Sequence, residues 1–109
     1  MARDVAPVAA DLAHIRASDL PKEGRDTLSL IRKGGPFPYP KDGSIFSNRE
    51  RVLPKEPRGF YHEFTVKTPR SRDRGARRIV CGGMTGKPPT SGVCYYTDDH
   101  YTSFKKIKE

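Results

Sequence analysis

The sequence offers little material for a large apolar interior. Only 34% of its 109 residues are hydrophobic, there is no tryptophan, and glycine and proline contribute 10 residues each, while 31% of the residues are charged. A chain of this length supports one domain with one core. We therefore expect a small core, many loops and many side chains in contact with water.

Long hydrophobic runs are also missing. No stretch approaches the roughly 20 apolar residues that a membrane-spanning helix needs. The first residues, MARDVAPVAADLAHIRAS, lack the basic region and the uninterrupted apolar region of a secretory signal. We expect no membrane association, and a chain that is either cytosolic or the mature or excised part of a longer one.

Cysteine is scarce. Cys81 and Cys94 permit at most one internal disulfide, and two cysteines with three scattered histidines are too few for a zinc site. The two cysteines flank the turn GGMTGKPPTSGV. A bridge closing this turn would contribute about 3 kcal/mol in the chain-entropy model. Two free thiols fit the sequence equally well, because facing registers cannot be read from it. No metal or other cofactor is expected.

Acidic residues are outnumbered, with 13 against 21 lysines and arginines, which gives a net charge of +8. This balance favours a partner rich in phosphate, bound by an attraction that weakens with salt. The basic residues are densest between Lys67 and Arg78. A merely soluble basic surface would explain the total charge, but it explains less well why five arginines lie between Arg70 and Arg78.

One helix is predicted in the N-terminal third of the chain. Ser18 or Asp19 is suited to cap it, and Gly34 with the glycine that follows is suited to stop it. Residues 1–17 lack a long apolar stripe, so we expect a weakly ordered lead-in or a short helix there. The domain proper is expected to span residues 18–109.

Strands are predicted in the second half, after a loop region rich in proline and glycine. Three runs have strand character, at 59–68, 76–82 and 94–97, and a fourth candidate lies at 102–107. A helix followed by successive strands with short returns predicts an α+β fold. We expect one main N-terminal helix packed on a twisted antiparallel β-sheet.

Alternation along the first strand places Glu63 on its polar face, and Arg78 on the next strand can lie beside it. A carboxylate, arginines and a histidine are the set that cleaves a phosphodiester carrying its own 2'-hydroxyl nucleophile, because they supply a base, a phosphate clamp and an acid. The candidates are Glu63, Arg74, Arg78, His100 and Tyr101. The plainer interpretations are a cross-strand ion pair of Glu63 with Arg78 and an exposed turn histidine paired with Asp98 or Asp99, and composition leaves both open.

Four ordered blocks of the sequence carry a family resemblance: DTLSLIRKGGPFPYPKDGSIFSNRERVLP, GFYHEFTVKTP, RGARRIVCG and YYTDDHYTSF. From Leu20 to Ile107 the chain resembles the bacterial guanyl-specific ribonucleases of the barnase superfamily, and among them the small secreted ribonucleases of the Sa type. The resemblance implies the microbial ribonuclease fold and cleavage through a 2',3'-cyclic phosphate.

The same resemblance implies roles for individual residues. Glu63 would be the general base and His100 the general acid, and the two would exchange roles when the cyclic phosphate is hydrolysed. The residues implied at the phosphate and beside the acid are Arg74, Arg77, Arg78 and Tyr101.

The block FSNRE matches the guanine site of that family. The Glu50 carboxylate would accept hydrogen bonds from N1 and the exocyclic amino group of guanine, and backbone amides would donate to O6. Adenine presents a different edge and would leave polar groups unpaired. The residues implied around the base are Tyr39, Phe46, Ser47, Asn48, Arg49 and Glu50. Without the resemblance, NRE would be interpreted as a charged turn.

The leading hypothesis is therefore an endoribonuclease that cleaves single-stranded RNA on the 3' side of guanosine without a metal. The alternative is a catalytically silent basic RNA-binding module. The resemblance further implies a secreted, monomeric protein, either a scavenging nuclease or the toxin portion of a larger one, with an acidic inhibitor resembling barstar.

Three departures from the family pattern limit the transfer. Ser47 stands where glutamine is common, the turn at 82–93 is enlarged, and the terminal disulfide of the Sa type is absent. The first departure bears on an edge contact to the base or on the depth of the site, and the second bears on the wall beside the phosphate.

Overall fold

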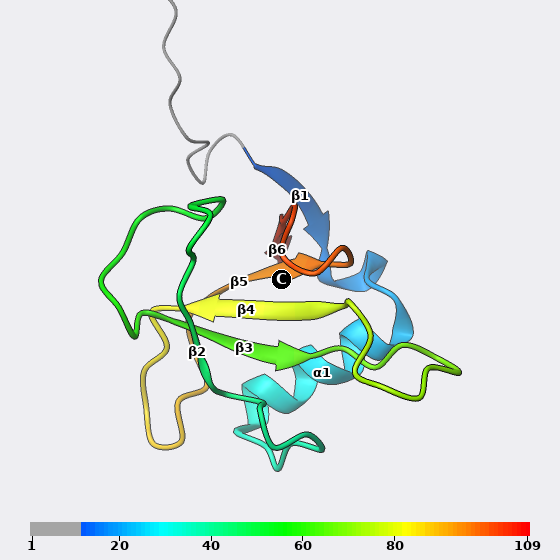
Figure 1. The fold of residues 1–109 in the computed structure, drawn as a ribbon. Helices are drawn as coiled ribbons and strands as arrows, with labels where there is room; N and C mark the ends of the chain where they lie inside the picture. The colour runs from blue at the N-terminus through cyan, green and yellow to red at the C-terminus, as the bar shows by residue number, and fades with distance from the viewer. Residues whose placement is uncertain (1–11) are drawn as a thin grey trace, which may run out of the picture.

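The protein is described by a computed structural model that covers residues 12–109, so the first part of the predicted lead-in, residues 1–11, lies outside the described residues (Figure 1). The elements in chain order are β1 (Ala13–Arg16), a 3-10 helix (Ala17–Asp19), α1 (Lys22–Lys33), β2 (Ile45–Phe46), β3 (Tyr61–Thr65), β4 (Arg78–Gly82), β5 (Val93–Thr97) and β6 (Lys105–Lys108). The strands form one six-stranded sheet in the order β1-β6-β5-β4-β3-β2, and α1 packs on one of its faces. The predicted α+β architecture is confirmed.

The helix α1 ends as the sequence predicts. Gly34 has a φ of 86°, a left-handed conformation that favours glycine, and its N–H donates to the carbonyl of Ile31. The predicted cap is wrong, because Pro21 precedes the first helical residue while Ser18 and Asp19 form the 3-10 turn before it. Leu20, which is buried, lies between the 3-10 turn and the start of α1. No helix among residues 12–109 is long and apolar enough to cross a membrane.

Part of the predicted lead-in is a strand. β1 runs parallel to β6, with Ala13 opposite Lys105 and Arg16 opposite Lys108, and Figure 1 shows the two strands side by side. The sheet is therefore mixed, not wholly antiparallel as expected. The cause is tertiary packing: Ile15 contacts the helix-side core and Leu12 contacts the core on the other face, a burial that the weak local pattern does not reveal.

The four predicted strands appear as β3 to β6, and each of these pairs with its neighbour in antiparallel fashion. The last one begins only at Lys105, because residues 98–103 form a turn. β2 was not predicted. It contributes two residues that pair with β3 inside the loop region rich in proline and glycine.

Two apolar clusters lie on opposite faces of the sheet. The helix-side cluster contains Leu20, Leu28, Ile31, Phe64, Val66, Ile79, Cys81, Cys94, Tyr96 and Ile107. The cluster on the other face contains Leu53, Tyr61, Val80, Tyr95 and Phe104. Because Glu63 alternates with Phe64 along β3, its side chain belongs to the face away from α1, as the sequence predicts.

The enlarged turn between β4 and β5 is fastened at its base. Cys81 and Cys94 are directly opposed and form a disulfide, so the register that the sequence does not reveal brings them together. Arg32 of α1 donates hydrogen bonds to the carbonyls of Thr90 (2.9 Å) and Gly92 (3.0 Å). The turn is thereby held against the end of the helix.

Candidate active site

A carboxylate with three polar neighbours lies on the face of the sheet away from α1. Glu63 Oε1 accepts hydrogen bonds from the hydroxyl of Tyr101 at 2.7 Å and from Arg74 Nη2 at 3.0 Å. Arg78 Nε lies 3.7 Å from the same oxygen. Only 15% of the Glu63 side chain is exposed. One carboxylate oxygen is thus contacted by two guanidinium groups and a phenol.

Arg78 is almost fully buried, with 2% of its surface exposed. It stands opposite Thr65 in the β3–β4 register, while Glu63 stands opposite Val80. Arg78 is therefore the diagonal neighbour of Glu63 on the same face of the sheet. Its Nη1 donates to the carbonyls of Gly75 (3.0 Å) and Arg77 (2.8 Å), and its Nε donates to the Tyr101 hydroxyl (3.1 Å). Arg78 therefore organises the preceding loop as well as the site.

Arg74 reaches the site from the loop before β4. Its Nε donates to Thr65 Oγ1 at 2.9 Å, so the guanidinium bridges two residues of the same strand face. Asp73 fixes the loop by accepting hydrogen bonds from Ser71 Oγ (2.7 Å) and the Gly75 amide (2.8 Å). The hydrogen bond from Ser71 and that from Gly75 lower the pKa of Asp73.

Tyr101 joins the carboxylate to the buried arginine, since its hydroxyl donates to Glu63 and accepts from Arg78. Burial, followed by the hydrogen bond to Glu63 and the nearby negative charge, raises the pKa of Tyr101 to about 12. The residue has a φ of 76°, and its amide donates to Thr97 Oγ1 at 3.3 Å. The phenol is therefore a protonated donor throughout the neutral range.

His100 lies on the exposed rim next to these groups. Its backbone is left-handed, with a φ of 56°, and its amide donates to the Ala76 carbonyl at 2.9 Å. The imidazole centroid is 4.7 Å from that of Tyr101. The turn thus presents an exposed imidazole beside the carboxylate site.

Asp99 fixes this turn from within. Its carboxylate accepts hydrogen bonds from Ser103 Oγ at 2.6 Å, the Ser103 amide at 2.9 Å and Thr97 Oγ1 at 2.7 Å. The hydrogen bond from the Ser103 hydroxyl is the largest cause that lowers the pKa of Asp99 to about 2. These oxygens bind the turn itself, and no ion pair joins His100 to Asp98 or Asp99 among the residues that the structure describes.

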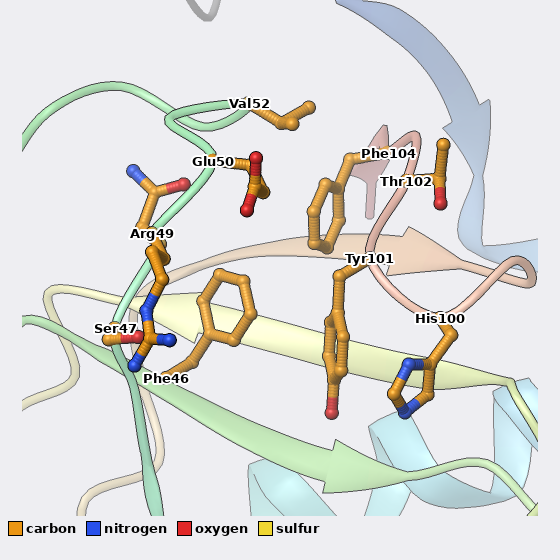
Figure 2. Close-up of a pocket in the computed structure, with 10 residues that line it drawn as sticks. Phe46, Ser47, Arg49, Glu50, Val52, His100, Tyr101, Thr102 and Phe104 are labelled. Carbon is orange, nitrogen blue, oxygen red and sulfur yellow. The ribbon is translucent and has the colours of Figure 1, made fainter.

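A cleft of about 550 Å³ opens beside the imidazole. Figure 2 shows one wall built from the loop after β2 and the other from the loop before β6. The residues that line it are Phe46, Ser47, Asn48, Arg49, Glu50, Val52, His100, Tyr101, Thr102 and Phe104. The sequence blocks FSNRE and DDHYTSF therefore meet across one cavity.

The first wall is a loop stiffened by its own asparagine. Asn48 Nδ2 donates to the Leu53 carbonyl at 2.9 Å, and Asn48 Oδ1 accepts from the Leu53 amide at 3.2 Å. Asn48 and Arg51 both have left-handed backbones, with φ of 52° and 56°. This tight turn leaves the Asn48 side chain occupied and places the exposed Glu50 carboxylate in the lining of the cleft.

Aromatic rings line the apolar part of the cleft. The centroids of Phe46 and Tyr101 are 4.9 Å apart, and those of Phe46 and Phe104 are 5.9 Å apart. Figure 2 shows Phe46 facing Tyr101 and Phe104 from the opposite wall. A planar base can stack against such rings, while Ser47 and Arg49 border the same space.

Five predicted site residues are not among those that line this cavity. Glu63, Arg74 and Arg78 form the carboxylate cluster that Tyr101 joins to it, whereas Tyr39 and Arg77 belong to neither group. Tyr39 is not among the residues that line the cleft. Its amide donates to Asp42 Oδ2 at 3.2 Å, and Asp42 Oδ1 accepts from the Thr65 amide at 2.8 Å. The loop that carries Tyr39 is thus fastened to the end of β3, and a contact of Tyr39 with the base stays a prediction.

Arg77 was predicted to lie at the phosphate, but the structure places it on the other face of the sheet. Its Nη1 lies 4.0 Å from Glu23 Oε1 on α1, so the side chain points to the helix face of the sheet. The strand alternation that puts Arg78 beside Glu63 puts Arg77 on the opposite face. A direct role for Arg77 at the phosphate is therefore corrected to an ion pair with the helix.

Thr65 and Phe104 belong to the site but were not predicted. Thr65 has a signal in the sequence, because alternation places it on the same face as Glu63, two residues away. Phe104 has none, since the turn that brings it to the cleft depends on the hydrogen bonds of Asp99.

Metal-ligating side chains do not gather in the part of the chain that the structure describes: residues 12–109 contain no group of three or more histidines, cysteines, aspartates or glutamates that could hold an ion. His62 directs its Nδ1 at the Gly43 carbonyl, 2.8 Å away. His14 lies on β1, at the edge of the sheet.

Comparison with known proteins identifies relatives over most of the chain. The profile of the ribonuclease family matches residues 3–108. Guanyl-specific ribonuclease St of Saccharopolyspora erythraea is 54% identical over 91 residues, which cover 84% of this chain and 83% of that protein. Guanyl-specific ribonuclease Sa of Kitasatospora aureofaciens is 51% identical over 92 residues, which cover 84% and 90%.

Solved structures give the same result for the fold. Ribonuclease Sa2 in complexes with mononucleotides superposes with a TM-score of 0.82 at 49% identity, covering 90% of this chain and 95% of that one. Ribonuclease Sa2 with guanosine-2'-cyclophosphate gives a TM-score of 0.78 at 48% identity, covering 89% and 96%.

Proposed function

This chain belongs to the ribonuclease family, and we infer that it is a guanyl-specific endoribonuclease. It cleaves single-stranded RNA on the 3' side of guanosine, first by transphosphorylation to a 2',3'-cyclic phosphate and then by hydrolysis. Its relatives are guanyl-specific ribonucleases, and ribonuclease Sa2 has been solved with guanosine-2'-cyclophosphate and with 3'-GMP.

The observation that carries this inference is the position of Glu63 beside the cleft. Its carboxylate receives hydrogen bonds from Tyr101 and Arg74, and Tyr101 also lines the cavity together with His100. Tyr101 thus joins a fixed carboxylate to a base-sized pocket that the exposed imidazole also lines. This is the arrangement that in-line attack by a ribose hydroxyl needs.

In the first step we assign the base to Glu63 and the acid to His100. The carboxylate takes the proton of the guanosine 2'-hydroxyl while O2' forms a bond to phosphorus. The bond between phosphorus and the 5'-oxygen of the next nucleotide breaks, and protonated His100 gives that oxygen its proton. DNA lacks the 2'-hydroxyl and is not a substrate for this step.

In the second step the two residues exchange roles. Neutral His100 takes a proton from water as the water oxygen attacks phosphorus. The bond to O2' breaks, and protonated Glu63 returns its proton to that oxygen. A 3'-phosphate is released, and both side chains regain their starting protonation states.

The arginines supply charge stabilisation in both steps. Arg74 and Arg78 lie within 4.0 Å of the Glu63 carboxylate, so a phosphoryl group at O2' of a bound guanosine comes close to both guanidinium groups. Donors fixed in place before the reaction stabilise the charge that develops on the phosphoryl oxygens. Arg74 is the more exposed of the two, with 25% of its side chain accessible against 3% for Arg78.

The loop after β2 provides the recognition of guanine. We propose that the Glu50 carboxylate accepts hydrogen bonds from N1 and the exocyclic amino group, and that the amides of Asn48 and Arg49 donate to O6. The Asn48 side chain is already bonded to Leu53, so it stabilises the loop while its backbone faces the base. Phe46 stacks on the ring.

Digestion of a defined RNA that contains each base once tests this function. Mass spectrometry of the products is expected to find guanosine 3'-ends, first as cyclic phosphates and later as 3'-phosphates. Glu63→Gln and His100→Ala are expected to lower kcat by on the order of 10²-fold to 10⁴-fold each, with the fold retained. Salt-sensitive RNA binding without any cleavage would instead identify a catalytically silent RNA-binding module.

We further propose that the enzyme acts outside the cell that makes it. The disulfide between Cys81 and Cys94 supports this proposal, because such bonds persist in oxidising compartments. A scavenging nuclease and a toxin portion of a larger protein both fit. A monomer is proposed, together with an acidic inhibitor resembling barstar in the producing cell, since the net charge of +8 favours an acidic partner.

A further inference from the structure

A row of basic side chains lies on the catalytic face of the sheet, outside the cleft. β6 follows directly from the cleft wall, and Phe104, Lys106 and Lys108 alternate onto one face of this strand. Lys106 stands opposite Tyr95 of β5, and both Tyr95 and Phe104 belong to the apolar cluster on the face away from α1. Lys106 and Lys108 therefore share a face with the active site.

The neighbouring strand, β1, adds a second row of basic side chains beside the first. β1 pairs in parallel with β6, with His14 opposite Lys106 and Arg16 opposite Lys108. Opposed residues on paired strands point to the same face. Figure 1 shows β1 lying along β6 at that end of the sheet. We call the set His14, Arg16, Lys106 and Lys108 the β1–β6 stripe.

The charges of the stripe are not neutralised within the described residues. No carboxylate among residues 12–109 forms a salt bridge with Arg16, Lys106 or Lys108. The arginines that face the helix side behave differently, because Arg32 pairs with Glu109 and Arg77 pairs with Glu23. On the face of the stripe itself, Arg74 and Arg78 pair with Glu63. The stripe differs from all these arginines because its cations have no carboxylate partner among residues 12–109.

Protection of the sheet edge is the plainer explanation for charged residues on a terminal strand. It covers His14 and Arg16, since β1 is the edge strand. It does not cover Lys106, because β6 lies between β1 and β5 and Lys106 pairs with His14 on one side and with Tyr95 on the other.

We propose that the β1–β6 stripe binds phosphates of the RNA substrate beyond the cleaved step, a proposal that rests on the ribonuclease function inferred above. The stripe continues from Phe104, which lines the base cleft, so a strand leaving the cleft along β6 meets it at once. Lys106 and Lys108 are separated by about 6.7 Å along the strand, which is comparable to the distance between consecutive phosphates of an extended single strand. The ligand is the polyanionic backbone, without preference for a base.

The test compares two variants of equal charge. The stripe variant carries Arg16→Gln, Lys106→Gln and Lys108→Gln. The matched control carries Lys33→Gln, Lys87→Gln and Lys105→Gln, which are all exposed, and Lys105 lies on the same strand but on its other face. The binding probe is a short single-stranded RNA in which its one guanosine is replaced by 2'-deoxyguanosine, so that it cannot be cleaved.

The stripe variant is expected to bind this probe at low salt on the order of 10-fold more weakly than the control does. The slope of log Kd against log salt is expected to fall by about 0.7 for each RNA phosphate that the variant no longer neutralises. Both variants are expected to cleave the dinucleotide guanylyl-(3',5')-cytidine with unchanged kcat/KM, because it does not reach the stripe.

Equal affinity and equal salt slopes for the two variants would overturn the proposal, since only total charge would then matter. A loss of dinucleotide cleavage in a folded stripe variant would also overturn it, because the stripe would then act on the reacting step. Failure of the unmodified protein to cleave any RNA would instead overturn the ribonuclease function. The two failures are therefore distinguishable.

Discussion

The hydroxyl of Tyr101 lies 2.7 Å from the carboxylate of Glu63 and donates a hydrogen bond to it, while Arg78 Nε donates to the same hydroxyl. The phenol therefore fixes the orientation of the proposed base and connects it to a buried cation. Because the pKa of Tyr101 is raised to about 12, the phenol keeps its proton as a donor throughout the neutral range.

Tyr101→Phe tests that connection. The ring and its packing against Phe46 are kept, while Glu63 loses its shortest hydrogen bond and Arg78 loses an acceptor. We expect kcat to fall by about 10-fold to 100-fold with a small change in KM, and the free energy of unfolding to fall by about 1 to 2 kcal/mol. Steady-state kinetics on a guanosine dinucleotide, together with urea unfolding, measure both. Unchanged kcat would show that the phenol does not position the base.

Thr65 is expected to act through Arg74 as a positioning residue, since Arg74 Nε donates to its hydroxyl at 2.9 Å. Thr65→Val keeps the shape but removes the acceptor, and we expect kcat to fall by about 10-fold. Thr65→Ser keeps the hydroxyl and is the matched control, with kcat close to that of the unmodified protein. If serine fails as badly as valine, the methyl packing matters and the hydrogen bond does not.

Glu50→Gln tests the recognition of guanine. Loss of hydrogen bonds to a charged acceptor removes about 1.5 to 3 kcal/mol, so kcat/KM for a guanosine substrate is expected to fall by about 10-fold to 100-fold. Glu56→Gln removes an exposed acid of the same loop region outside the cleft and serves as the control. Equal rates for the two variants would move the recognition of guanine elsewhere.

The disulfide is expected to stabilise the fold without taking part in the reaction. Cys81 and Cys94 are separated by 13 positions, and a loop of this size corresponds to about 3 kcal/mol in the chain-entropy model. The double variant Cys81→Ala/Cys94→Ala is expected to lose about that much free energy of unfolding in urea, while kcat at 25 °C stays unchanged. A large loss of kcat in the folded variant would tie the enlarged turn to the active site.

Asp99 makes stability depend on acid. Its pKa is lowered to about 2 in the folded protein by hydrogen bonds from Ser103 and Thr97, whereas an unfolded aspartate titrates near about 3.9. The resulting stability is present above about pH 4 and is lost as the pH falls through about 2. Asp99→Asn is expected to lower the Tm at pH 7 and to leave it nearly unchanged at pH 2. An equal shift at both pH values would rule out the charge as the cause.

Much of the site follows from local patterns in the sequence. Strand alternation puts Glu63 on the polar face and Arg78 within reach, and the structure brings them to 3.7 Å. The same alternation assigns Arg77 to the face opposite Arg78, whereas the family resemblance places it at the phosphate. The ion pair of Arg77 with Glu23 agrees with the alternation and not with a position at the phosphate.

Other features depend on contacts between distant residues. β1 forms because Leu12 and Ile15 find apolar partners on two faces of the sheet, and no periodicity in a four-residue strand signals this. The opposition of Cys81 and Cys94 depends on the β4–β5 register. The family resemblance places Tyr39 near the base, while the hydrogen bonds through which Asp42 ties its loop to Thr65 cannot be read from the sequence.

The most direct test of the proposed mechanism follows the reaction of guanylyl-(3',5')-cytidine by phosphorus NMR, with the unmodified protein and with Glu63→Gln. The mechanism predicts that guanosine 2',3'-cyclic phosphate accumulates first and then converts to guanosine 3'-phosphate, and that both conversions slow by at least about 100-fold in the variant. Direct formation of guanosine 3'-phosphate without the cyclic species, or equal rates for the two proteins, would contradict it.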